Sequence, residues 1–95
     1  MIAMKQDRAE TLALQALAWM AADDDLAARF AGATGASLAE GRERLQDPVF
    51  LASVLEFLLQ EDRWVMAFCE AHGLPYEEPM RALAALPGGR RDEWP

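Results

Sequence analysis

The chain has 95 residues, of which 53% are hydrophobic and 26% are charged, and its net charge at pH 7 is -7. This length suits one small domain, and this composition excludes a disordered segment. The negative charge argues against a protein that coats the phosphates of nucleic acids or anionic lipid, so binding to nucleic acid is expected to be absent or weak.

Alanine and leucine dominate the sequence, with 19 and 13 copies against three valines and one isoleucine. Because these two residues lose little on entering a helix, the composition predicts an all-α fold. No apolar run approaches the roughly 20 residues of a membrane span, and the N-terminus lacks the pattern of a signal peptide. The single cysteine, Cys69, cannot form an internal disulfide, which favours a cytoplasmic location.

The first helix is predicted from about Lys5 to Ala22, because its apolar residues recur on one arc. Three aspartates, 23–25, then favour an N-cap and first turn, followed by a short helix through Phe30 that glycines interrupt. Ser37 and Glu40 form a capping box that predicts a third helix of about two turns.

Asp47 and Pro48 predict the start of the most apolar helix, about Pro48 to Gln60. Its apolar arc is wider than that of an ordinary surface helix, so it is predicted to be the centre of the fold.

A fifth helix is predicted from about Arg63 to His72, ended by Gly73 with Leu74 folding back, and a last helix from 76–79 to Pro87. The prediction is one helical domain over residues 1–89, a compact bundle of five or six short helices, and a polar tail over 90–95.

Catalytic, cofactor and metal sites are not indicated. Cys69 and His72 are three residues apart on one helix, but zinc requires four ligands and the chain has one cysteine and one histidine. Carboxylate pairs occur at predicted helix starts, where capping explains them. We therefore expect Cys69 to be a buried thiol and the chain to need no cofactor or metal ion.

Residues 25–45 superficially resemble a helix-turn-helix, with a turn at Gly35 and a second helix that carries Arg42 and Arg44. However, Gly41 and Arg44 occupy positions where that motif buries apolar residues. Glutamates also balance the arginines, so DNA binding is the weaker alternative.

Aromatic residues are the remaining signal of function. Trp64 and Phe68 are expected in the core. Exposed apolar side chains would instead mark a surface for a partner, and the candidates are Phe57, Leu59, Trp94 and Trp19. Because residues 47–95 hold nine carboxylates and four arginines, the partner is expected to be a basic protein or, alternatively, a second copy of the chain.

Several segments resemble a bacterial family catalogued only as domain of unknown function 3572, found mainly in alphaproteobacteria. They are ALQALAWMA (13–21), DPVFL (47–51), LEFLL (55–59), WVMAFC (64–69), GLPY (73–76), LPGG (86–89) and WP (94–95). The resemblance implies a single domain in a bacterial cytoplasm and supplies no activity, ligand or catalytic residue. The sequence thus favours a non-enzymatic protein–protein interaction module over a DNA-associated regulator, with an enzyme that uses Cys69, His72 and a carboxylate as the third possibility.

Overall fold

The computed structural model describes residues 4–35, 41 and 43–87, and five helices can be given bounds within them. They are α1 (Gln6–Ala21), α2 (Asp24–Thr34), α4 (Pro48–Leu58), α5 (Asp62–His72) and α6 (Glu78–Ala84). No strand occurs in these residues, so the all-α prediction is confirmed. The predicted helix that opens at Ser37 lies mostly outside the described residues, and so does the tail over 90–95.

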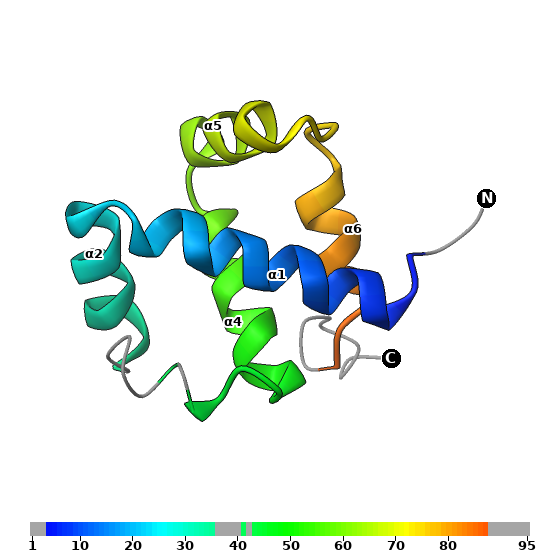
Figure 1. The fold of residues 1–95 in the computed structure, drawn as a ribbon, viewed down its shortest axis with the longest axis horizontal. Coiled ribbons are helices and arrows are strands. Elements are labelled where there is room, and N and C mark those ends of the chain that lie inside the picture. The colour runs from blue at the N-terminus through cyan, green and yellow to red at the C-terminus, as the bar shows by residue number, and fades with distance from the viewer. Residues whose placement is uncertain (1–3, 36–40, 42, 88–95) are drawn as a thin grey trace, which may run out of the picture.

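Two crossed helices form the centre of the fold. In Figure 1, α1 runs across the front of α4, with α2 on one side of the pair, α6 on the other and α5 above. Both α1 and α4 contact α2 and α6 as well as each other. The prediction that α4 is central is therefore confirmed, and α1 is equally central because it contacts the same helices.

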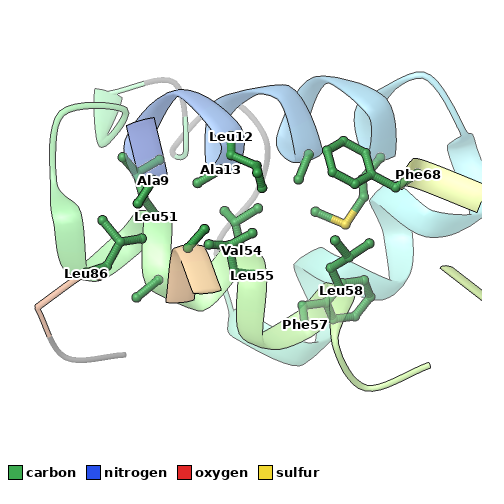
Figure 2. Packing of buried hydrophobic residues seen from close by; sticks show 14 of the residues in the cluster. Ala9, Leu12, Ala13, Leu51, Val54, Leu55, Phe57, Leu58, Phe68 and Leu86 are labelled. Carbon is green, nitrogen blue, oxygen red and sulfur yellow. The ribbon is translucent and has the colours of Figure 1, made fainter. Parts of the chain in front are cut away.

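The core lies between α1 and α4. In α4, seven of eleven residues are buried, whereas α1 contributes a narrower stripe that is rich in alanine. Figure 2 shows Ala9, Leu12 and Ala13 of α1 facing Leu51 and Leu55 of α4. Because alanine side chains are short, they let the two helix backbones approach each other closely and leave the larger α4 side chains to fill the space.

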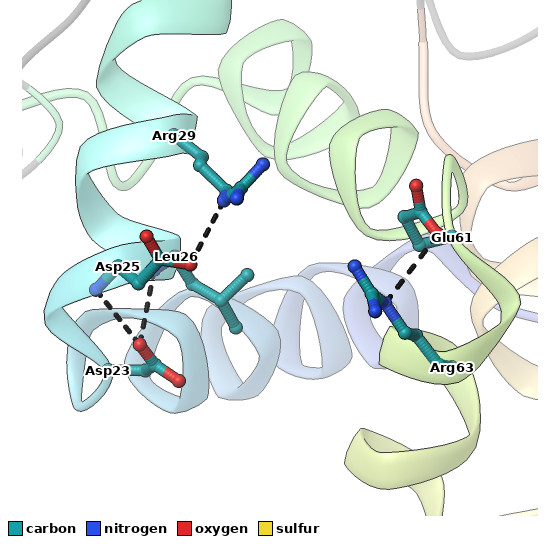
Figure 3. Close-up of polar contacts among 6 residues, drawn as sticks. All are labelled: Asp23, Asp25, Leu26, Arg29, Glu61 and Arg63. Carbon is teal, nitrogen blue, oxygen red and sulfur yellow. Dashed lines mark hydrogen bonds and ion pairs between the residues drawn. The ribbon is translucent and has the colours of Figure 1, made fainter.

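The predicted helix starts at Asp23 and Asp47 are confirmed. One carboxylate oxygen of Asp23 accepts hydrogen bonds from the backbone N–H groups of Asp25 (2.9 Å) and Leu26 (3.2 Å), as Figure 3 shows. Asp47 accepts one from the N–H of Val49 (3.0 Å), with Pro48 in the first turn. These bonds satisfy donors that a helix start leaves unpaired.

One predicted boundary is wrong. The glycine pattern predicts that the second helix stops near Phe30, but α2 continues through Gly32 and ends at Gly35, whose φ of 74° is left-handed. A helical glycine costs about 1 kcal/mol relative to alanine. Burial of Phe30 against the rings of Phe50 and Phe57 offsets that cost.

The end of α5 follows the predicted pattern. Gly73 has a φ of 67°, and the backbone N–H groups of Gly73 and Leu74 both donate to the carbonyl of Cys69. Leu74 packs against the core. The last helix is shorter than predicted, because after Ala84 the backbone bonds tighten to a three-residue spacing.

Replacing Asp23 with alanine is expected to lower the free energy of unfolding by about 1 kcal/mol, because two backbone N–H groups of α2 lose their acceptor. Urea denaturation followed by circular dichroism measures the loss. Glu61→Ala is the matched control, since Glu61 precedes α5 without a capping hydrogen bond. Equal losses in the two variants would contradict the assignment.

Candidate functional site

Three of the four candidate surface residues lie in the described part of the chain, one of them buried and two half-buried. Phe57 is only 4% exposed, so its expected place at the surface is wrong. Its ring stacks on Trp64, with centroids 5.0 Å apart, and forms a T-shaped pair with Phe30, with centroids 5.5 Å apart. Burial of Phe57 results from contacts with α2 and α5 on two sides of α4, which periodicity within α4 cannot reveal.

Trp19 and Leu59 are half-buried. The Trp19 ring meets Phe68 edge to face, with centroids 5.8 Å apart, and Leu59 packs against the core at the end of α4. Phe68 is fully buried and Trp64 is half-buried, so the predicted core position is confirmed for Phe68. Trp94 lies outside the described residues. None of the three described candidates is among the exposed large apolar side chains of the described residues.

A groove opens instead between the end of α2 and the face of α4 that points away from α1. Its volume is about 310 Å³, near the lower limit of ligand pockets in proteins, and it holds one or two side chains. The described residues that line it come from three segments: Ala33, Thr34, Arg44, Val49, Phe50, Ser53, Glu56, Phe57 and Gln60.

The groove residues of α4 follow helical spacing. Val49, Ser53, Glu56 and Gln60 lie four, three and four residues apart, so they share one face of the helix. The rings of Phe50 and Phe57 border this face, and Val49 is 55% exposed. Sequence periodicity contained a signal for this site, because Val49 is an apolar residue on the face opposite the core.

Charges of opposite sign lie along the groove, Arg44 before the start of α4 and Glu56 one helical turn before Gln60. The Arg44 guanidinium lies over the Phe50 ring, 5.0 Å from its centroid. Its nearest carboxylate oxygen, Asp47 Oδ2, is 3.8 Å away, which is long for an ion pair. Glu56 is half-buried and forms no ion pair or hydrogen bond with any described residue. Six residues of helix separate Phe50 from Glu56, which is about 9 Å along α4. The groove therefore offers a cation, an apolar floor and a free carboxylate in that order.

Cys69 and His72 do not pair. The Cys69 thiol donates to the carbonyl of Pro75 (3.4 Å), and His72 Nδ1 lies 3.0 Å from the carbonyl of Phe68. Burial raises the pKa of Cys69, and the charges of Glu78 and Glu77 raise it further. A thiol held in its protonated form is a poor nucleophile.

Alkylation of Cys69 by iodoacetamide at pH 8 is expected to be slower in the folded chain than in urea, by on the order of a hundredfold or more. The buried thiol is reached only when the structure opens and its thiolate fraction is low. Mass spectrometry of timed samples measures both rates. Equal rates would show that Cys69 is accessible and reactive.

The described arginines of the helix-turn-helix-like region lie beside carboxylates. Arg29 bonds Asp25 at 3.0 Å, as Figure 3 shows, and Arg44 lies near Asp47. Arg42 lies outside the described residues. The turn at Gly35 is present, and Gly41 is buried against Phe50. Because nearby carboxylates partly neutralise these two arginines, they create little positive potential to attract the phosphate backbone of DNA.

Two features are absent from the part of the chain that the structure describes. No group of three histidine, cysteine, aspartate or glutamate side chains comes together there to hold a metal ion. None of the helices in the same residues combines the length and the apolarity that crossing a bilayer requires.

The described part of the chain is a small all-α bundle with an amphipathic groove between α2 and α4. The chain matches the family described as "Protein of unknown function (DUF3572)" over residues 6–89, and it therefore belongs to that family. This confirms the resemblance of its sequence segments. No curated protein and no solved structure matches the chain.

Proposed function

We propose that this chain is a non-enzymatic protein-interaction module of the cytoplasm that binds a segment of a partner protein in the groove between α2 and α4. The observation that carries the proposal is the position of Val49, an exposed apolar side chain that, with Phe50 and Phe57, lines a groove of about 310 Å³. A cavity of this kind suits one large apolar side chain, the usual anchor of a protein interface.

The two charges of the groove favour a particular kind of segment. A carboxylate of the partner would pair with Arg44, and a lysine or arginine would pair with Glu56. About 9 Å separates these positions along α4, which an extended segment spans in about three residues. The proposed ligand is therefore a segment with a large apolar residue between an acidic and a basic one.

Site-specific crosslinking followed by reconstitution tests the proposal. A photo-reactive residue replaces Gln60, which is exposed at the groove, and in a second protein it replaces Ala28, which is exposed on the far face of α2. We expect a partner that crosslinks from position 60 and not from position 28. Once purified, this partner should bind the Val49→Asp variant at least about tenfold more weakly than the original chain.

Val49→Asp is a useful variant because it should fold normally. Position 49 lies in the first turn of α4, where the helix dipole favours negative charge. Thermal unfolding confirms that the variant is folded. Unchanged affinity of the purified partner for Val49→Asp, or equal crosslinking from positions 60 and 28, would overturn the groove as the binding site.

A further inference from the structure

An exposed apolar strip lies on the corner formed by α5 and the start of α6, away from the α2–α4 groove. Of the five large apolar side chains that the described part of the chain exposes, three belong to this corner: Met66 (44%), Tyr76 (47%) and Met80 (63%). Single exposed apolar residues are common on protein surfaces, so the proposal depends on their continuity and on the charges beside them.

Local geometry connects the three side chains. Met66 and Glu70 are four residues apart on α5, so they are neighbours on one face. The Tyr76 hydroxyl donates a hydrogen bond of 2.6 Å to Glu70 Oε2, which fixes the tyrosine beside that face. Met80 follows Tyr76 by four residues, and the intervening Glu77 has helical φ and ψ angles (-83° and -6°). Met66 and Tyr76 are thus linked through Glu70, and Met80 follows at the start of α6.

Two carboxylates that form no ion pair with a described residue lie beside the strip, and the arginines near it, Arg63 and Arg81, each lie 3.7 Å from a glutamate. Glu70 and Glu77 are exposed and are paired with no cation in the described residues, whereas Glu78 is partly neutralised by Arg8 (3.2 Å) and Arg81 (3.7 Å). Such a surface repels a second copy of itself and attracts a cationic partner.

We infer that this strip is a second docking surface and that its occupant is a basic amphipathic helix of another protein. Successive turns of such a helix present apolar residues to Met66, Tyr76 and Met80, while its lysines or arginines approach Glu70 and Glu77. Unbranched methionine side chains adapt to differently shaped partners, and the anchored tyrosine loses little freedom on binding. The inference is independent of the groove, because the two surfaces share no residue.

Fluorescence anisotropy with synthetic helices of about 14 residues, or four turns, tests the inference. The probe is an amphipathic leucine/lysine helix, and the comparison is the same helix with glutamate in place of lysine. We expect the lysine helix to bind and the glutamate helix not to bind. Binding should weaken several-fold when sodium chloride is raised to about 0.5 M, because the Debye length then shortens to about 4 Å.

Paired variants localise the binding. Met66→Ala with Met80→Ala should weaken it about tenfold, and Glu70→Gln with Glu77→Gln about fivefold at low salt. The matched control for charge is Asp24→Asn with Glu43→Gln, two exposed carboxylates outside the strip, which should change affinity less than about twofold. Val49→Asp should also leave it within about twofold, which separates this surface from the groove.

Three results would overturn the inference. The first is equal binding of the lysine and glutamate helices. The second is an equal loss in the control and strip charge variants, which would indicate attraction to the whole acidic chain and not to this strip. The third is a dimer in analytical ultracentrifugation that Met66→Ala with Met80→Ala dissociates, because the strip's occupant would then be a second copy.

Discussion

Replacing Leu55 with alanine is expected to lower the free energy of unfolding by about 2–5 kcal/mol. Leu55 is fully buried in α4, where α1 and α6 both contact that helix, and Figure 2 shows it beside Val54 in the core. Removing most of its side chain forfeits buried apolar area and leaves a cavity that the crossed helices cannot close. For a chain of this size, whose total stability is about 5–15 kcal/mol, the loss is a large fraction. Urea denaturation followed by circular dichroism measures it.

Leu14→Ala is the matched control, since it makes the same chemical change within a helix at a side chain that is 37% exposed. We expect it to change stability by less than about 1 kcal/mol, because alanine has the higher helix propensity and little apolar contact is lost. Comparable losses at positions 14 and 55 would mean that α4 is not the centre of the core.

Features fixed by neighbouring residues were predictable from the sequence. The helix starts at Asp23 and Asp47 and the glycine terminator at Gly73 depend on side chains within a few residues of the affected backbone. The central position of α4 was predictable too, since its apolar surface is too wide for a single neighbour to cover.

Features that depend on how the helices cross were not predictable. Hydrophobic patterning underestimates the importance of α1, because alanine is only weakly hydrophobic. Its contribution is a small side chain that lets α1 pack against the larger residues of α4. Patterning puts Phe57 at one edge of the wide apolar arc of α4, so the sequence makes it a candidate surface residue. Its burial requires Phe30 and Trp64 from two other helices.

The groove depends on such non-local contacts as well. Ala33 and Thr34 at the end of α2 and Arg44 before α4 come together with Val49 only in the folded chain. Sequence spacing could place Val49 on the polar face of α4, but it could not show that another helix stands opposite.

Gly41→Ala is expected to lower the free energy of unfolding by about 1–2 kcal/mol, although alanine is the better helix former. A Cβ at position 41 would lie 2.9 Å from Cζ of Phe50, inside van der Waals contact. The Phe50 ring is buried, with Phe30 against it edge to face (6.1 Å) and the Arg44 guanidinium over it, so displacing the ring costs these contacts. Overpacking costs about 1–3 kcal/mol, which exceeds the gain of up to about 1 kcal/mol in helix propensity.

The same substitution at Gly32 should have the opposite sign. Gly32 lies in α2, and a methyl group added there would meet no atom within 4 Å, so Gly32→Ala is expected to stabilise the chain by about 0.5–1 kcal/mol. Chemical denaturation of the two variants under identical conditions measures both signs. Stabilisation by both substitutions would contradict the packing of Gly41 on Phe50.

A double-mutant cycle identifies the contact itself. Phe50→Leu removes the Cζ atom that the new methyl group would meet, so the cost of Gly41→Ala should fall by about 1 kcal/mol in the Phe50→Leu background. An additive pair would show that the cost arises elsewhere in the backbone. Because Phe50 also lines the groove, a ring displaced by the added methyl group would move toward the proposed binding site. Gly41→Ala should therefore also weaken binding of the partner in the groove. Binding of the leucine/lysine helix at the α5–α6 strip should be unchanged.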